Sequence, residues 1–281
     1  MRTLFFLLSA LLLTATPLLA QLQAPQPSPL STVSQSVGLV DVTVAYSRPS
    51  ARGRKVVGEL LPYDQLWRSG ANQATKVSLS DELSVAGTTV PAGDYALFTI
   101  PGKKSWTVIL NKNTEQSGTG SYKKEEDVLR ADVPVSVTKD KYETFTIGFS
   151  DLSETKATMY LAWENTKVNV PLQDSNVDSK VMAQIDEQMA SAGNDAGLYY
   201  QAANYYFAMD KDLQQAQQWI DKAVSLDDSK FWVLHLQAKI HAKTKDFEKA
   251  RDAAQKSKKL AQENGNQDYV RLNEKLLESM N

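Results

Sequence analysis

The chain has 281 residues, of which 42% are hydrophobic and 23% charged, a composition typical of a globular protein with one large or two smaller domains. It holds 31 Lys and Arg against 33 Asp and Glu, so it lacks the excess positive charge of a nucleic-acid-binding protein. The absence of cysteine excludes disulfides, thiolate metal sites and cysteine nucleophiles. The two histidines, His235 and His241, lie in a helical pattern, so no Ser-His-Asp triad, metal centre or cofactor is predicted.

The N-terminus has the pattern of a secretory signal peptide. Arg2 supplies a positive charge, residues 4–13 are almost wholly apolar, and Ala20 offers a small residue for cleavage. A retained membrane anchor is the less favoured alternative, because polar residues interrupt the apolar stretch and it falls short of the roughly 20 residues of a span. We therefore predict a signal peptide over residues 1–20 and an exported protein, periplasmic or extracellular, with no membrane span after signal removal.

A proline-rich tether and a β-domain are expected next. Prolines alternate at positions 25, 27 and 29, which predicts an extended tether over residues 21–30. In residues 31–172 apolar side chains recur at every second position, in about nine short runs such as Val40–Tyr46 that turn-type residues separate. Since no long helical pattern intervenes, we predict an antiparallel β-sandwich or barrel over residues 31–172, with one short helix near 63–68.

Residues 173–281 change to helical periodicity. Similar hexapeptides begin at Lys211 and Lys245, which are 34 residues apart, the length of a tetratricopeptide helix-turn-helix unit. We therefore predict an all-α tetratricopeptide-like repeat domain that docks a protein partner, and an α+β protein of two domains overall. After a first helix that ends near Gly193, the expected helices span 195–209, 212–226, 229–243, 246–262 and 267–280.

The densest group of basic residues lies between Tyr46 and Lys76. Six basic residues stand against two acidic ones there, a local charge of +4; the six are Arg48, Arg52, Arg54, Lys55, Arg68 and Lys76. Arginine binds carboxylate, phosphate or sulfate bidentately, and a tryptophan can stack on a sugar ring. We predict a site for an anionic small molecule or a glycan, with the ligand-binding residues Arg48, Arg52, Arg54, Trp67, Arg68 and Asn72. The structural alternative, which is the commoner outcome for such clusters, is that the arginines pair with Asp127, Asp132 or Glu143 on neighbouring strands.

Two functions of different classes remain open. The first is a non-catalytic binding or scaffolding module of the cell envelope, and the second is an envelope hydrolase that uses carboxylates, since histidine and cysteine routes are closed. Acidic groups such as Glu125–Asp127 exist, but the sequence gives no distance between their side chains. The binding module is favoured because no acid stands directly beside the arginines, and a purely structural sandwich in a larger assembly is a third possibility.

A series of short motifs runs through about residues 36–172. They are Tyr46–Ser50, Gly53-Arg54, Gly58, Leu61–Tyr63, Trp67–Asn72, Pro91–Tyr95, Ile100–Gly102, Trp106 with Asn111, Gly118–Tyr122 and Asp127–Arg130. In combination they resemble the bacterial domain-of-unknown-function (DUF) family 2911. The resemblance implies a secreted protein of a Bacteroidota-type bacterium, often with a helical repeat tail. The family carries no established activity, so the resemblance implies no reaction.

Overall fold

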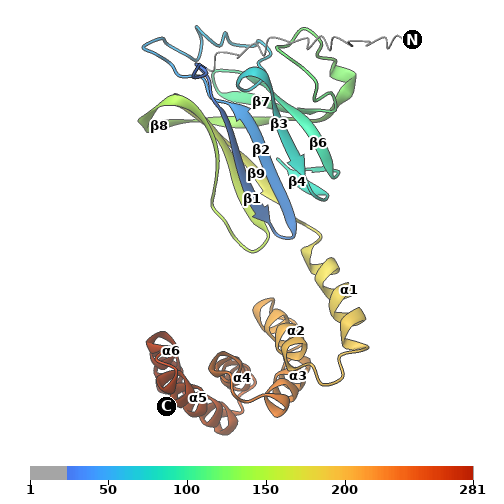
Figure 1. Cartoon of the computed structure of the whole chain (residues 1–281), viewed down its shortest axis with the longest axis vertical. Coiled ribbons are helices and arrows are strands. Elements are labelled where there is room, and N and C mark those ends of the chain that lie inside the picture. The colour runs from blue at the N-terminus through green and yellow to red at the C-terminus, as the bar shows by residue number, and fades with distance from the viewer. Residues whose placement is uncertain (1–23, 281) are drawn as a thin grey trace, which may run out of the picture. The chain divides into compact units, whose positions relative to one another are not determined.

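The computed structural model describes residues 24–280, and the predicted signal peptide lies outside the described residues. The chain divides into two compact units, the first ending at Ser175 and the second beginning at Asn176. Within residues 24–280 the first unit contains nine strands and the second six α-helices (Figure 1), which confirms the α+β class. None of the helices in this described range is long and apolar enough to cross a membrane.

The strands of the first unit form one antiparallel sheet in the order β1-β2-β3-β6-β7-β8-β9-β4-β5. Apolar residues alternate along them as predicted: in β2, Val40, Val42 and Val44 are buried while Asp41 is exposed. Their bounds are β1 (Leu30–Val37), β2 (Val40–Ser47), β3 (Ala71–Leu79), β4 (Leu83–Val85), β5 (Thr88–Val90), β6 (Gly93–Pro101), β7 (Ser105–Asn111), β8 (Asp127–Ser150) and β9 (Lys156–Gln173).

The long strand β8 belongs to both parts of the sheet. It has 24 residues, and its first part pairs with β7 while its second part pairs with β9. Register shifts on either side of Tyr142 mark bulges, which bend a strand, and Figure 1 shows β8 as a long curved ribbon. Two of the short apolar runs in the sequence, at residues 133–137 and 145–149, are therefore parts of one strand and not separate strands. Side chains from both parts of the sheet meet in one buried cluster, as a sandwich requires.

The loop of residues 48–70, between β2 and β3, contains no helix, so the prediction of a short helix near 63–68 is wrong. Asp64 has a φ of 61°, which lies outside the right-handed helical region. The N–H of Asp64 donates to the carbonyl of Pro101 at 2.9 Å, and Trp67 exchanges two backbone hydrogen bonds of 2.8 Å with Thr99. These bonds to β6 satisfy backbone groups that a helix would otherwise pair.

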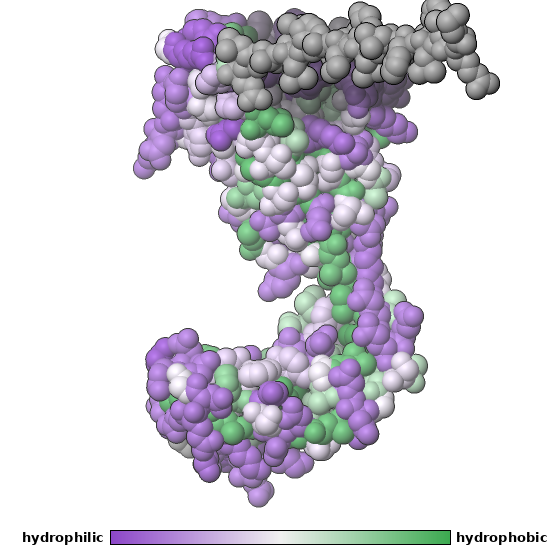
Figure 2. All heavy atoms as spheres, viewed as in Figure 1, coloured by the Kyte–Doolittle hydropathy of each residue, from purple (hydrophilic) through white to green (hydrophobic). Residues whose placement is uncertain are grey.

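The second unit consists of helices close to the predicted spans. Two of them have matching N-caps: the Asp212 carboxylate accepts the N–H of Gln214 at 2.9 Å, and the Asp246 carboxylate accepts that of Lys249 at 3.4 Å. The predicted helical region is confirmed, and its tetratricopeptide-like character stays a prediction. On the face that Figure 2 shows, hydrophilic residues cover most of this unit. The bounds are α1 (Val177–Met189), α2 (Ala196–Ala208), α3 (Leu213–Leu226), α4 (Phe231–Lys243), α5 (Phe247–Glu263) and α6 (Gln267–Glu278).

Candidate functional site

Two of the predicted ligand-binding arginines donate to oxygens of the protein itself. Arg48 is half-buried; its Nε donates to the carbonyl of Phe145 at 3.1 Å and its Nη2 to Thr146 Oγ1 at 2.8 Å, which ties the loop to β8. Arg54 is exposed, and its Nε donates to the carbonyl of Ala51 at 2.9 Å. Arg48 therefore fastens two elements together, and Arg54 closes a turn within its own loop.

Arg52 and Asn72 hold the end of the predicted tether. Arg52 Nη2 donates to the carbonyl of Pro27 at 3.1 Å, and Asn72 Nδ2 donates to the carbonyl of Ser28 at 3.3 Å. The backbone N–H of Arg52 also donates to the Glu143 carboxylate at 2.6 Å. The structure thus brings these two predicted site residues together, around a segment of their own chain.

Trp67 and Arg68 lie side by side in the sequence but have different surroundings. Trp67 packs at the edge of the core, stacked on Trp163 with ring centroids 5.7 Å apart, and its indole N–H donates to the carbonyl of Gly70 at 3.1 Å. Arg68 is half-buried, and its buried Nε has no hydrogen-bond partner within the part of the chain that the structure describes. Trp67 is therefore occupied by packing, whereas Arg68 keeps an unused donor.

The acids of the structural alternative mostly have other partners. Asp127 pairs with Arg130 at 3.2 Å, and Asp132 accepts a hydrogen bond from Thr107 at 2.6 Å. Across residues 24–280, no ion pair joins a carboxylate to Arg48, Arg52, Arg54 or Arg68. The side chains of Arg48, Arg52 and Arg54 donate to neutral oxygens, and the backbone N–H of Arg52 donates to Glu143.

Four motif residues form a separate polar cluster. The Tyr122 hydroxyl donates to Asp127 at 2.7 Å, Arg130 Nη1 donates to Tyr122 at 3.0 Å, and Asn111 Nδ2 donates to Asp127 at 2.9 Å. Burial and the neighbouring Asp127 raise the pKa of Tyr122 to about 12. The Tyr122 ring also contacts Phe98, so the cluster fastens the segment after β7 onto the sheet.

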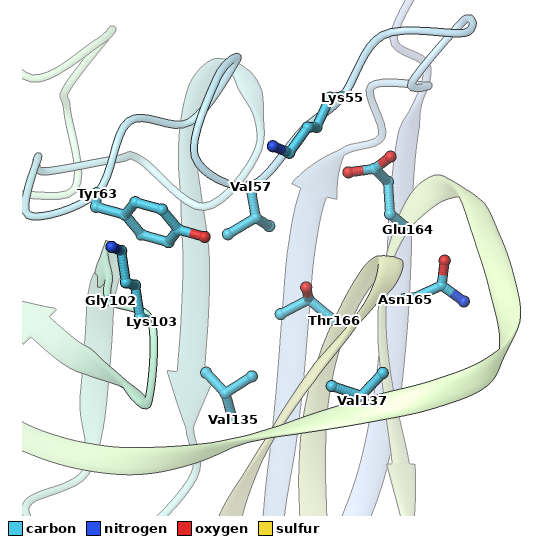
Figure 3. A pocket seen from close by; sticks show the side chains of 10 residues that line it. All are labelled: Lys55, Val57, Tyr63, Gly102, Lys103, Val135, Val137, Glu164, Asn165 and Thr166. Atoms are coloured by element: carbon cyan, nitrogen blue, oxygen red, sulfur yellow. The ribbon is translucent and has the colours of Figure 1, made fainter.

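A pocket of about 430 Å³ opens beside the later part of the loop of residues 48–70 (Figure 3). The loop, the β6–β7 turn, β8 and β9 all contribute to it. It is lined by Lys55, Val57, Tyr63, Gly102, Lys103, Val135, Val137, Glu164, Asn165 and Thr166.

Two lysines and a tyrosine supply its hydrogen-bond donors. In Figure 3 the Lys55 ammonium and the Tyr63 hydroxyl point toward the space between them. Lys103 Nζ lies 5.6 Å from the centroid of the Tyr63 ring, a cation–π distance that holds the lysine beside the tyrosine. The Lys55 ammonium and the Tyr63 hydroxyl therefore face the opening, and the Lys103 ammonium lies beside the Tyr63 ring.

A glycine allows Tyr63 to pack in this position. Gly58 has a φ of 93°, which side chains rarely adopt, and a Cβ atom there would lie 2.8 Å from Cε2 of Tyr63. Any other residue at position 58 would strain the backbone and displace the ring.

Glu164 supplies a carboxylate, but that carboxylate is already bonded. Its Oε2 accepts the N–H of Val56 at 2.6 Å, its Oε1 lies 3.8 Å from Lys141 Nζ, and its side chain is only 18% exposed. Glu164 also has a φ of 51°, a strained value for a non-glycine residue. Such strain concentrates at functional sites, so its place on the pocket wall is a functional indication.

Valines form the apolar side of the pocket. Val137 is 85% exposed, which is unusual for a valine in a strand, and it pairs across the ladder with Thr166. Val57 and Val135 also line the pocket. An exposed apolar surface beside convergent donors is typical of a ligand-binding site.

The residues that line this pocket are not among the predicted ligand-binding residues. Lys55 belongs to the predicted group of basic residues, whereas no sequence pattern singled out Lys103 or Glu164. A usable signal existed in the motifs: Gly58, Leu61–Tyr63 and Ile100–Gly102 all lie at or beside the pocket. Charge density pointed instead to the arginines.

These observations define a class: an antiparallel β-domain with a small polar-and-apolar pocket, followed in the chain by a helical unit. Residues 28–172 match the family described as "Protein of unknown function (DUF2911)", and since this is just over half of the chain, the protein belongs to that family. No curated protein matches the chain, and no solved structure does. The family resemblance inferred from the motifs is thus confirmed for the β-domain.

Proposed function

We propose that the β-domain is a binding module for a small anionic molecule with an apolar part, held in the pocket of Figure 3. The observation that carries this proposal is the placement of Lys55, Lys103 and the Tyr63 hydroxyl beside the exposed Val137. The ammonium groups would bind the anion, the hydroxyl would donate a hydrogen bond to it, and the valine would contact the apolar part.

The charge of the pocket favours an anion. Glu164 is compensated by Lys141 and by the N–H of Val56, so it leaves the two lining lysines largely available. Lys55 forms an ion pair with Glu59 at 3.5 Å, but both side chains are 64% exposed. Such a pair is worth only about 0–1 kcal/mol, so an anionic ligand can replace Glu59 as its partner.

The size of the pocket suits a small molecule. Its volume of about 430 Å³ lies within the roughly 300–1,000 Å³ of known ligand pockets. Each methylene group that a ligand buries against the valines adds about 0.8 kcal/mol, so an apolar part would contribute to affinity. An aromatic or short aliphatic phosphate, sulfate or carboxylate has the matching chemistry.

The carboxylate hydrolase receives less support. Its mechanism needs two carboxyl groups separated by roughly 5–9.5 Å across the substrate. Among the described residues that line this pocket, Glu164 is the one carboxylate, and it is bonded to Val56. A binding module requires no second acid.

The helical unit is proposed as a protein-docking scaffold of an exported chain. The matching caps at Asp212 and Asp246 support the 34-residue repeat, and exposed aromatic side chains at Trp232 and Phe247 offer contact surface. The pattern at the N-terminus supports export.

Isothermal titration with phenyl phosphate tests the proposed pocket. We expect Lys55→Ala and Lys103→Ala each to weaken binding about tenfold, which corresponds to about 1.4 kcal/mol. Lys112→Ala is the matched control, because Lys112 is exposed on the same unit and does not line the pocket. Benzyl alcohol, which keeps the ring but lacks the charge, should not bind. Absence of phenyl phosphate binding, or equal affinity in all three variants, would overturn the proposal.

A further inference from the structure

Residues 27–29, here called the strap, lie across the start of the β2–β3 loop. Three hydrogen bonds hold the strap: Arg52 Nη2 donates to Pro27 O at 3.1 Å, Asn72 Nδ2 to Ser28 O at 3.3 Å, and the N–H of Arg48 to Pro29 O at 2.9 Å. Each bond ends on a backbone carbonyl of the strap. The loop and the start of β3 therefore supply all three donors.

The composition of the strap fits this arrangement. Pro27 and Pro29 have no N–H, so the segment offers carbonyl acceptors with few competing donors, and proline keeps it extended. Pro27 and Pro29 are exposed and Ser28 is half-buried, so the strap adds little buried surface. A segment held mainly by three hydrogen bonds, each worth roughly 1 kcal/mol, can detach without unfolding the domain.

The two side chains that hold the strap project from left-handed backbone. Arg52 has a φ of 53° and Asn72 a φ of 59°. Asparagine adopts this region readily, whereas it is uncommon for arginine. Asn72 Nδ2 also donates to Ser47 Oγ at 3.2 Å, which orients the amide toward the strap.

The strap is linked to the pocket through a short piece of the loop. At one end of this piece, Arg52 is held by the strap through its side chain and by Glu143 through its N–H. At the other end, the N–H of Val56 is held by Glu164, which lines the pocket. Lys55 lies between these anchors, so its position depends on both.

We propose that the strap regulates the anion pocket. The docked strap keeps residues 52–56 in the conformation that presents Lys55 to the pocket. When the strap is released, residues 52–56 can move. The ligand must then order these residues on binding, which lowers its affinity. This inference rests on the proposed function of the pocket. Because such coupling is reciprocal, a bound anion also favours the docked strap.

The double variant Arg52→Asn/Asn72→Gly tests the coupling. Asparagine and glycine tolerate the left-handed conformation. At position 52 the asparagine amide is several bonds shorter than the arginine side chain and so does not reach Pro27, and at position 72 glycine has no side chain to donate. We expect the affinity for phenyl phosphate to fall about threefold and hydrogen–deuterium exchange at residues 53–57 to accelerate. Lys112→Ala is the matched control, since it removes one positive charge, as Arg52→Asn does, from an exposed residue of the same unit that neither holds the strap nor lies in the loop; it should change neither quantity.

Two results would overturn the inference: unchanged exchange at residues 53–57 in the double variant, or equal effects in the double variant and in Lys112→Ala. The exchange measurement needs no ligand. If phenyl phosphate failed to bind the unmodified protein, the proposed function would fall, while faster exchange in the double variant would still support the link between strap and loop.

Discussion

The basic residues of the β2–β3 loop are used in two different ways. At the start of the loop, Arg48, Arg52 and Arg54 donate to oxygens of the chain itself. Farther along, Lys55 faces an open pocket with a weak, exposed partner. A basic side chain contributes to a binding site when its donors remain available, and a count of charges along the sequence does not measure availability.

The largest expected effect on stability concerns two glycines of this loop. Gly53 and Gly58 both have positive φ, but a Cβ at Gly53 has nothing within 4 Å while one at Gly58 meets Tyr63 at 2.8 Å. Gly53→Ala should cost about 1 kcal/mol for the backbone conformation alone, and Gly58→Ala about 3 kcal/mol because crowding adds to it. Urea unfolding measures the free energy of unfolding of both variants. Equal decreases would show that the Tyr63 ring can move aside without an energetic cost.

A second pair of variants separates stability from binding. Arg48→Ala should lower the free energy of unfolding by about 1–2 kcal/mol, because it leaves the Phe145 carbonyl without the donor that it has now, and should leave phenyl phosphate affinity unchanged. Lys55→Ala should weaken phenyl phosphate binding and change the free energy of unfolding by less than about 0.5 kcal/mol. Urea unfolding and calorimetric titration of both variants measure the contrast. Loss of affinity in Arg48→Ala at unchanged stability would place the ligand at the arginines.

Tyr63→Phe sharpens the assignment of the pocket. The variant keeps the ring beside Lys103 but removes the hydroxyl that points into the pocket. We expect about a threefold rise in the Kd for phenyl phosphate, as for one lost hydrogen bond, with no change in the midpoint of unfolding. An unchanged Kd would remove the hydroxyl from the proposed contacts.

The smallest effect concerns Lys76, whose ammonium has a carboxylate partner. Lys76 pairs with Asp94 at 2.7 Å, and the two side chains are 45% and 52% exposed. The hydrogen bond from Lys76, followed by that from Ser78, lowers the pKa of Asp94 below its usual 3.8. A carboxyl group whose pKa is lower in the folded than in the unfolded state stabilises the fold at pH values above its unfolded-state pKa. This stabilisation is lost as the pH falls through the folded-state pKa.

Asp94→Asn should therefore cost less than about 0.5 kcal/mol at pH 7, given the exposure of the pair. The difference from the unmodified protein should shrink as the pH falls below 3.8 toward the lowered folded-state pKa of Asp94, because the folded carboxyl becomes protonated there. Urea unfolding at pH 7 and pH 3 measures it, and a difference independent of pH would show that the carboxylate charge is not its cause.

Local patterns predicted the elements but not how distant elements meet. Alternation located the β-strands, and the four-residue spacing of Val181, Ile185 and Met189 located α1, because these periods reflect burial of one face. The helix near 63–68 was predicted wrongly because the backbone bonds of Asp64 and Trp67 go to β6, which local sequence does not show.

The candidate site was partly hidden for the same reason. Lys103 and Glu164 are 61 residues apart in the chain and meet at the pocket only through the pairing of β7, β8 and β9. The arginines were visible as a dense run, but their partners Phe145 and Pro27 belong to other segments. Gly58 carried more information about the pocket than charge did, because the absence of a Cβ there lets the Tyr63 ring approach the backbone closely.

The long strand β8 has a consequence for how the β-domain loses its structure. One continuous backbone pairs with β7 at one end and with β9 at the other, and both parts of the sheet contribute side chains to the same buried cluster, so loss of either ladder weakens the packing of the other. The domain should therefore unfold as a single cooperative unit, with one transition by tryptophan fluorescence and by circular dichroism. In a chain without cysteine, this shared strand provides the covalent link between the parts of the sheet that a disulfide supplies in other sandwiches.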